Sequence, residues 1–128
     1  MSRSAFAQVV VLFIALIAGA TGAAQDARPS AADLHDAYAQ GVEFVDVRSD
    51  SEWAAGHLDN AVHVPVDQVT DRAASALPDK NKPLVLYCGS GRRAQTAAET
   101  LRGLGYTNVT AMTGGYVDLK AAGFPVAP

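Results

Sequence analysis

Residues 30–128 alternate between short apolar runs and segments with a helical pattern. The apolar runs have the length of strands and lie at 43–47, 61–65, 83–88 and 108–112. Helices are expected where apolar side chains recur every three or four residues, or where cap residues frame a shorter segment: 31–40, 49–56, 66–77, 92–104 and 116–123. This alternation predicts an α/β fold, with a mostly parallel sheet covered by helices on both faces.

Small and polar residues mark the ends of several expected helices. Ser30 precedes the first helix, and Ser49 or Asp50 precedes the second. Serine and aspartate favour helix starts because their side chains accept hydrogen bonds from the free N–H groups of the first turn. Gly56 ends the second helical segment and Gly105 follows the fourth helix, positions where glycine is the preferred stop.

The run at 83–88 is apolar without a break, which is typical of a strand buried on both faces of a sheet. In the helix expected at 92–104, the apolar positions form one stripe that consists of Ala94, Ala97, Ala98, Leu101 and Leu104. Because most of these side chains are small, the helix can pack closely against the sheet. We therefore expect the loop between the two elements to lie at the carboxyl end of a central strand.

The first 24 residues have a different character. Arg3 is followed by an uncharged, mostly apolar segment at 5–20 and then by small residues, a pattern typical of a secretory signal peptide. The sequence thus predicts a signal peptide at 1–24, a linker at 25–29 and one domain at 30–128, exported to the periplasm or another extracytoplasmic compartment. The alternative is an uncleaved membrane anchor, since the apolar segment is near the lower length limit for a transmembrane helix.

Composition limits the expected partners. The chain has 128 residues, of which 49% are hydrophobic and 18% charged, enough for one globular domain. Its net charge is −3, and removal of residues 1–24 would remove one arginine and give −4. The absence of a basic run argues against nucleic acid as a partner, and we expect membrane contact only if the leader stays attached. With one cysteine, the chain can form no internal disulfide.

That cysteine, Cys88, ends the central apolar run and is followed by Gly89, Ser90, Gly91, Arg92 and Arg93. In open α/β sheets, ligands bind at the carboxyl ends of the strands. The loop residues can adopt positive φ and bring backbone N–H groups close to a ligand, and the next helix adds the N–H groups of its first turn. Such a ring of donors favours an anion and favours thiolate over thiol, so we predict that Cys88 is an activated nucleophile.

The arginine pair supports an anionic substrate. Positive charge at a helix N-terminus opposes the helix dipole, so Arg92 and Arg93 are locally unfavourable there. A bound anion or a thiolate would offset this cost. We therefore predict that both arginines, together with the backbone of Gly89, Ser90 and Gly91, bind substrate.

Other chemistries fit the loop less well. A dinucleotide-binding fingerprint is expected in the first βα turn, with a nucleotide-binding half after it, but only 34 residues follow Ala94. A cysteine phosphatase has a longer loop than the four residues between Cys88 and Arg93. A cysteine hydrolase needs a histidine base, and none of the three histidines is near Cys88 in the sequence. The histidines and the cysteine also lack the spacing of zinc ligands.

Four motifs resemble, in order, those of the rhodanese family of sulfurtransferases in its single-domain form, across residues 30–126. They are DVR at 46–48, EWAAGHL at 52–58 with NAVHVP at 60–65, CGSGRRA at 88–94, and GGY at 114–116 with AGFPV at 122–126. The chain departs from many family members after the double glycine, where Tyr116 and Leu119 stand in place of a tryptophan. The resemblance implies a rhodanese-like fold with a central five-stranded sheet.

The resemblance also implies an activity. Cys88 would take the outer sulfur of thiosulfate or a similar small sulfur-containing anion as a persulfide and pass it to cyanide or a thiol. A protein is a further candidate acceptor. The N–H groups of the loop would stabilise the persulfide, Arg93 occupies the family's arginine position, and no metal or organic cofactor is implied. Two alternatives stay open: a sulfur-relay or sensing module with little turnover, and a cysteine enzyme acting on arsenate or phosphate.

Four residues around the predicted site receive structural roles. We expect Asp46 and Arg48 to order the strand end near the loop, with Arg48 pairing with Glu52. His57 is expected to be a hydrogen-bonded structural histidine rather than a base. Trp53 is expected to anchor its short helix in the core.

Overall fold

The computed structural model describes residues 29–128. The predicted signal peptide at 1–24 and all of the predicted linker except Pro29 lie outside these residues. Within the described part of the chain, no helix is both long enough and apolar enough to cross a membrane.

Strands and helices alternate along this part of the chain. The helices are α2 (Ala31–Ala39), α3 (Asp50–Ala55), α4 (Val69–Ala76), α5 (Arg92–Gly103) and α6 (Tyr116–Ala121), with a 3₁₀ turn, η2, at Val66–Gln68. The strands are β1 (Glu43–Asp46), β2 (His57–Leu58), β3 (Val62–His63), β4 (Leu84–Cys88), β5 (Val109–Gly115) and β6 (Val126–Ala127).

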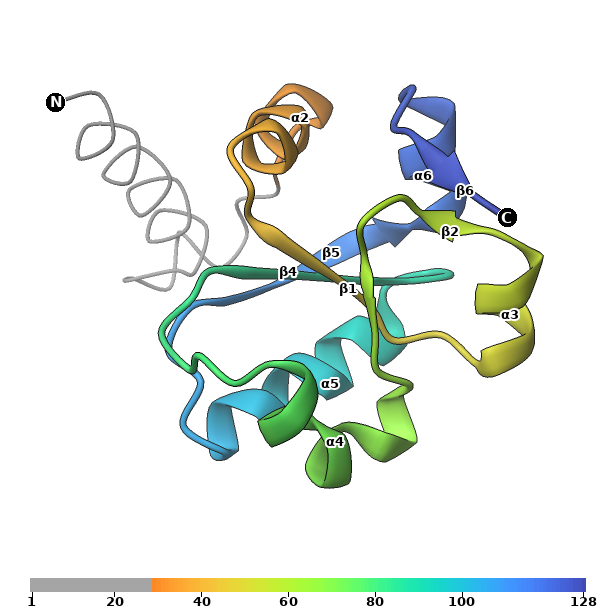
Figure 1. The fold of residues 1–128 in the computed structure, drawn as a ribbon. Helices are drawn as coiled ribbons and strands as arrows, with labels where there is room; N and C mark the ends of the chain where they lie inside the picture. The colour runs from red at the N-terminus through yellow and green to blue at the C-terminus, as the bar shows by residue number, and fades with distance from the viewer. Residues whose placement is uncertain (1–28) are drawn as a thin grey trace, which may run out of the picture.

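The central sheet has the strand order β3-β1-β4-β5, and all its neighbouring strands run parallel. Helices α4 and α5 cover one face, and α2 and α6 lie on the other (Figure 1). The predicted α/β fold is therefore confirmed. The count of five strands is wrong for the described residues, whose central sheet has four. The two remaining strands, β2 and β6, pair with each other antiparallel and are too short to show a period in the sequence.

Strand β4 passes through the centre of the domain, and all five of its side chains are buried. Its residues alternate between two hydrophobic clusters, as strand geometry requires. Leu84, Leu86 and Cys88 pack on the side of α4 and α5, whereas Val85 and Tyr87 pack on the side of α2 and α6. This alternation places the thiol on the same face of the sheet as the helix that follows it.

The predicted caps are mostly correct. The side chains of Ser30 and Ser49 accept hydrogen bonds from the third residue of α2 and α3, and the acidic residue at each third position bonds back to the serine N–H. Asp50 is thus the first residue of α3, not its cap. Gly105 follows α5 with φ 98°, a backbone conformation that glycine adopts without strain.

Strand β5 extends further than its apolar pattern indicates. The sequence predicts a strand at 108–112, but β5 continues to Gly115 because Cys88 pairs with Gly115 after a shift in register beyond Leu86. The double glycine is therefore part of the sheet, directly beside the end of β4.

Trp53 does not lie in the core, contrary to the prediction. None of the residues of α3 is fully buried, and the indole is stacked between two imidazole rings. Its ring centroid is 3.4 Å from that of His57 and 4.6 Å from that of His63. Since α3 is short and lies at the periphery, this stack rather than burial in the core attaches it to β2 and β3.

Candidate active site

Cys88 lies at the carboxyl end of β4, beneath the loop that leads into α5. The residue is fully buried, whereas Gly89 and Ser90 are exposed. The backbone N–H of Gly91 donates a hydrogen bond to the Cys88 sulfur over 2.9 Å. The chain therefore turns back over the sulfur, and the predicted contact between the thiol and a loop N–H group is present.

Gly91 is the loop residue whose conformation requires glycine. Its φ is 104°, and a Cβ at this position would collide with the carbonyl oxygen of Thr113 on β5. Gly89 and Ser90 do not have positive φ, although the sequence allowed it for the whole loop. The single turn at Gly91 brings its own N–H group to the sulfur.

The end of β5 packs backbone to backbone against the same loop. A Cβ on Gly115 would meet the carbonyl oxygens of Cys88 and Gly89. The N–H of Gly115 donates a hydrogen bond to Asp118 Oδ2 over 2.8 Å, which links the strand end to α6. One residue of the double glycine, Gly115, is thus required because no side chain fits between β5 and the Cys88 loop.

Gly115→Ala is expected to destabilise the protein by about 1–3 kcal/mol, the usual cost of inserting a methyl group into a well-packed site, and to displace the Cys88 loop. Urea unfolding measures the first effect, and the rate at which a thiol reagent modifies Cys88 reports the second. Gly103→Ala is the control, because a Cβ on Gly103 meets nothing within 4 Å. Equal stability of the two variants would contradict the close approach of β5 to the loop.

The two arginines of the loop differ in their contacts. Arg93 donates to both carboxylate oxygens of Glu52, over 2.7 Å and 3.1 Å. These hydrogen bonds are the main reason that the pKa of Glu52 is lowered to about 2. Hydrogen bonding to Glu52 likewise raises the pKa of Arg93, and the nearby Cys88 sulfur adds to the rise. Arg92 is exposed and forms no ion pair with any described residue.

The predicted pair between Arg48 and Glu52 is therefore wrong. Arg48 instead binds Asp46, with Nη2 2.7 Å from Oδ2 and Nε 3.0 Å from Oδ1, and both residues are buried. Arg48 Nη2 also donates to the carbonyl oxygen of Gly56 over 2.7 Å, and the guanidinium lies 4.3 Å from the ring centroid of Tyr116. The pair connects the end of β1, the end of α3 and the start of α6, as the predicted ordering role requires.

The histidines are engaged elsewhere. His57 Nδ1 is 2.9 Å from the carbonyl oxygen of Trp53, which confirms its structural role. His63 Nε2 is 2.9 Å from the carbonyl oxygen of Arg48, and His35 Nε2 is 2.8 Å from that of Ala122. Because a carbonyl oxygen only accepts, each of these ring nitrogens carries a proton. None of these three hydrogen bonds reaches Cys88, and residues 29–128 contain no group of three acidic, histidine or cysteine side chains placed to hold a metal.

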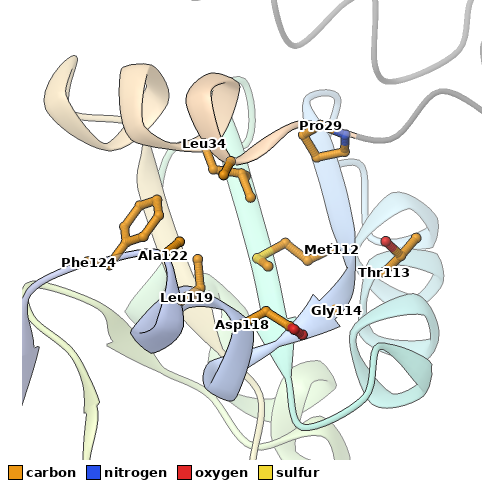
Figure 2. Close-up of a pocket in the computed structure, with 10 residues that line it drawn as sticks. Pro29, Leu34, Met112, Thr113, Gly114, Asp118, Leu119, Ala122 and Phe124 are labelled. Atoms are coloured by element: carbon orange, nitrogen blue, oxygen red, sulfur yellow. The ribbon is translucent and has the colours of Figure 1, made fainter.

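A cavity of about 410 Å³ lies on the other face of the sheet, between α2, β5 and α6. Figure 2 shows that its lining is largely apolar, with Leu34, Met112, Leu119 and Phe124 around it. No residue from Cys88 to Arg93 lines it. The candidate chemistry therefore belongs to the loop and not to this cavity.

Comparison with known proteins agrees with the motifs. The model of the rhodanese-like domain family matches residues 30–122. The chain belongs to the rhodanese family. It is 37% identical over 76 residues to the thiosulfate sulfurtransferase PspE of Escherichia coli (strain K12), a match that covers 59% of this chain and 72% of that protein. It is also 36% identical over 91 residues to the tRNA uridine(34) hydroxylase of Erwinia tasmaniensis, covering 65% of this chain but only 26% of that enzyme.

Solved rhodanese structures share the fold. The solution structure of a rhodanese-like domain from Anabaena superposes with a TM-score of 0.69 at 28% identity and covers 79% of this chain and 80% of that one. A structure described as rhodanese with anions from E. coli gives a TM-score of 0.59 at 34% identity, covering 66% of this chain and 95% of that one. The rhodanese-like fold implied by the sequence motifs is thus confirmed.

The structure places the predicted site residues together at the end of β4 and adds one residue, Glu52, to them. The structure brings Cys88, its loop and the start of α5 together, as expected. Glu52 was missed as part of this site, although it begins the motif at 52–58. Its place at the start of a family motif indicated a role for this carboxylate. The sequence could not show that Arg93 is its partner, because the pairing depends on where α3 lies in the fold.

Proposed function

We propose that the protein is a sulfurtransferase that moves a sulfane sulfur from a donor such as thiosulfate to cyanide or a thiol through a persulfide on Cys88. The observation that carries the proposal is the Gly91 N–H aimed at the Cys88 sulfur in a loop that returns over the thiol. Kinship with the thiosulfate sulfurtransferase PspE supports the reaction class.

The transfer has two steps. The Cys88 thiolate attacks the outer sulfur of thiosulfate, a new S–S bond forms, and the bond to the sulfonate sulfur breaks with its electron pair leaving on sulfite. Cyanide or a thiolate then attacks the outer sulfur of the persulfide and regenerates the Cys88 thiolate. Backbone N–H groups between Gly89 and Arg93 stabilise the persulfide anion, and the positive charge at the start of α5 attracts the anionic donor. The chemistry calls for neither a metal nor an organic cofactor.

The alternatives predict different products. An arsenate- or phosphate-acting enzyme would have to wrap a tetrahedral oxyanion, and the four residues between Cys88 and Arg93 favour a single added sulfur instead. A sulfur-relay module would form the persulfide but release its sulfur to a protein partner and only slowly to cyanide.

The test is an intact-mass measurement. The protein incubated with thiosulfate is expected to gain the mass of one sulfur atom, and one equivalent of cyanide is expected to remove it and yield thiocyanate. Retention of the adduct in cyanide favours the relay module. Failure to gain sulfur, together with hydrolysis of a phosphate ester or reduction of arsenate, would overturn the proposal.

We also propose that the protein acts outside the cytoplasm, in the periplasm or an equivalent compartment. The support is the basic, apolar and small-residue order of residues 1–24. The N-terminal sequence of the protein recovered from the exporting cell is expected to begin near residue 25. An N-terminus at Met1 in the membrane fraction would favour the anchor.

A further inference from the structure

The adjacent arginines at the start of α5 have opposite surroundings. The guanidinium of Arg93 is held by both oxygens of Glu52, a bidentate arrangement that fixes its plane as well as its position. The side chain of Arg92 is exposed and has no hydrogen-bond or ion-pair partner among residues 29–128. One cation of the pair is therefore fixed, and the other has no side-chain partner in the described part of the chain.

The pair between Glu52 and Arg93 lies directly against the nucleophile loop. A Cβ on Gly89 would be 3.1 Å from Arg93 Nη2 and 3.9 Å from Glu52 Oε2. Gly89 is the first residue after Cys88, so the guanidinium packs on the backbone that covers the sulfur. Glu52 thus connects α3 to this loop across 41 residues of sequence.

The pairing of Glu52 with Arg93 also determines which residue carries the net positive charge of the loop. The charges of Glu52 and Arg93 largely cancel, whereas the charge of Arg92 is not compensated by any described residue. The first turn of α5 contains no acidic side chain, so Arg92 also opposes the helix dipole there. An anion bound at the loop would relieve both costs.

We propose that Glu52 is a positioning residue of the sulfur-transfer loop, which holds Arg93 against Gly89 and leaves Arg92 to select the anionic donor. The inference rests on the proposed function, because it divides roles within the same site. The uncompensated charge of Arg92 favours donors with two negative charges and a transferable outer sulfur, such as thiosulfate. Donors with one negative charge, such as an alkanethiosulfonate, would bind less well.

The first test measures the field around Cys88 without any sulfur transfer. Iodoacetate and iodoacetamide both alkylate the thiolate with loss of iodide, but only iodoacetate is an anion. Arg92→Gln is expected to lower the ratio of the iodoacetate rate to the iodoacetamide rate about fivefold, or about 1 kcal/mol, the upper range for exposed charge pairs. Arg72→Gln removes the same charge from the exposed surface of α4 and is expected to leave the ratio as in the wild type.

Glu52→Gln is expected to change the same ratio in the opposite direction. Loss of the carboxylate leaves Arg93 as a second uncompensated cation near Cys88, so the ratio should rise by about twofold to fivefold. Loosening of the fold alone would change both alkylation rates together and would not move the ratio. This readout therefore separates a positioning role of Glu52 from a merely structural one.

Turnover supplies the second test. Glu52→Gln and Arg93→Gln are each expected to lower kcat with thiosulfate about tenfold, and the double variant should be no slower than the slower single variant, because the two residues act as a unit. Arg92→Gln is expected to raise the KM for thiosulfate more than the KM for methanethiosulfonate.

Several results would overturn the inference: an unchanged alkylation ratio in Arg92→Gln, a ratio that does not rise in Glu52→Gln, or losses of kcat that add in the double variant. If the wild type is alkylated at Cys88 with the expected ratios but gains no sulfur from thiosulfate, the proposed function fails, and the donor assignment fails with it. Because alkylation requires no sulfur transfer, the two failures are distinguishable.

Discussion

Cys88→Ser is expected to abolish sulfur transfer, with a loss of at least about a thousandfold, as for other enzymes that lose their nucleophile. A serine hydroxyl is not ionised at neutral pH and forms no persulfide, so the variant should gain no sulfur from thiosulfate and release no thiocyanate. Colorimetric detection of thiocyanate and intact mass measure the two outcomes.

The same variant is expected to keep its fold. Serine is close in size to cysteine, and its hydroxyl can accept the hydrogen bond that Gly91 N–H gives the sulfur. Urea unfolding should therefore give a stability near that of the wild type, which attributes the loss of activity to chemistry. A Cys88→Ser protein that still acquires a cyanide-labile sulfur would show that Cys88 is not the carrier.

Arg48→Met is expected to destabilise the protein by about 3–5 kcal/mol, because it leaves the carboxylate of Asp46 buried without its charged partner. The Asp46 side chain is completely buried and that of Arg48 is 6% exposed, so water cannot replace the lost hydrogen bonds. Native domains are stable by only about 5–15 kcal/mol, so this loss would remove a large part of the total stability. Urea unfolding with far-ultraviolet circular dichroism measures the difference.

Lys82→Met provides the matched control. Lys82 pairs with Glu43 over 3.3 Å, but its side chain is 45% exposed, and such surface pairs contribute only about 0–1 kcal/mol. Each variant replaces one paired cation by methionine, but the cation is buried at Arg48 and largely exposed at Lys82. Similar losses of stability in both would contradict the assignment of Asp46 and Arg48 as a buried pair that orders the strand end.

The sequence was a good guide wherever one local property decided the structure. The helix caps at Ser30 and Ser49 follow from side chains that bond within three residues. The strand at β4 follows from an unbroken apolar run, and the position of Cys88 at its carboxyl end follows from the glycines and the helix after it. The resemblance to rhodaneses depends on motifs of the same local kind, and the comparisons confirmed it.

The pairing of Glu52 shows where local reasoning failed. Arg48 is only four residues away and is the nearer candidate in sequence, but it lies two positions after Asp46, the last residue of β1, and both its backbone N–H and its guanidinium donate to the Asp46 carboxylate. Its guanidinium is therefore buried beside Asp46. Glu52 is left to Arg93, 41 residues away, because α3 lies beside the start of α5.

By itself, the sequence determined the α/β class, the order of the principal elements and the position of Cys88 at the carboxyl end of the central strand, before a glycine-rich loop and a helix, since each depends on short-range periodicity or on residues adjacent in the chain. Only the tertiary structure decided that Trp53 stacks between two histidines, that β2 pairs with β6, that Gly115 packs on the Cys88 loop and that Glu52 holds Arg93. These contacts join segments distant in sequence, and their geometry is fixed by how the elements pack around the sheet, which no local pattern records.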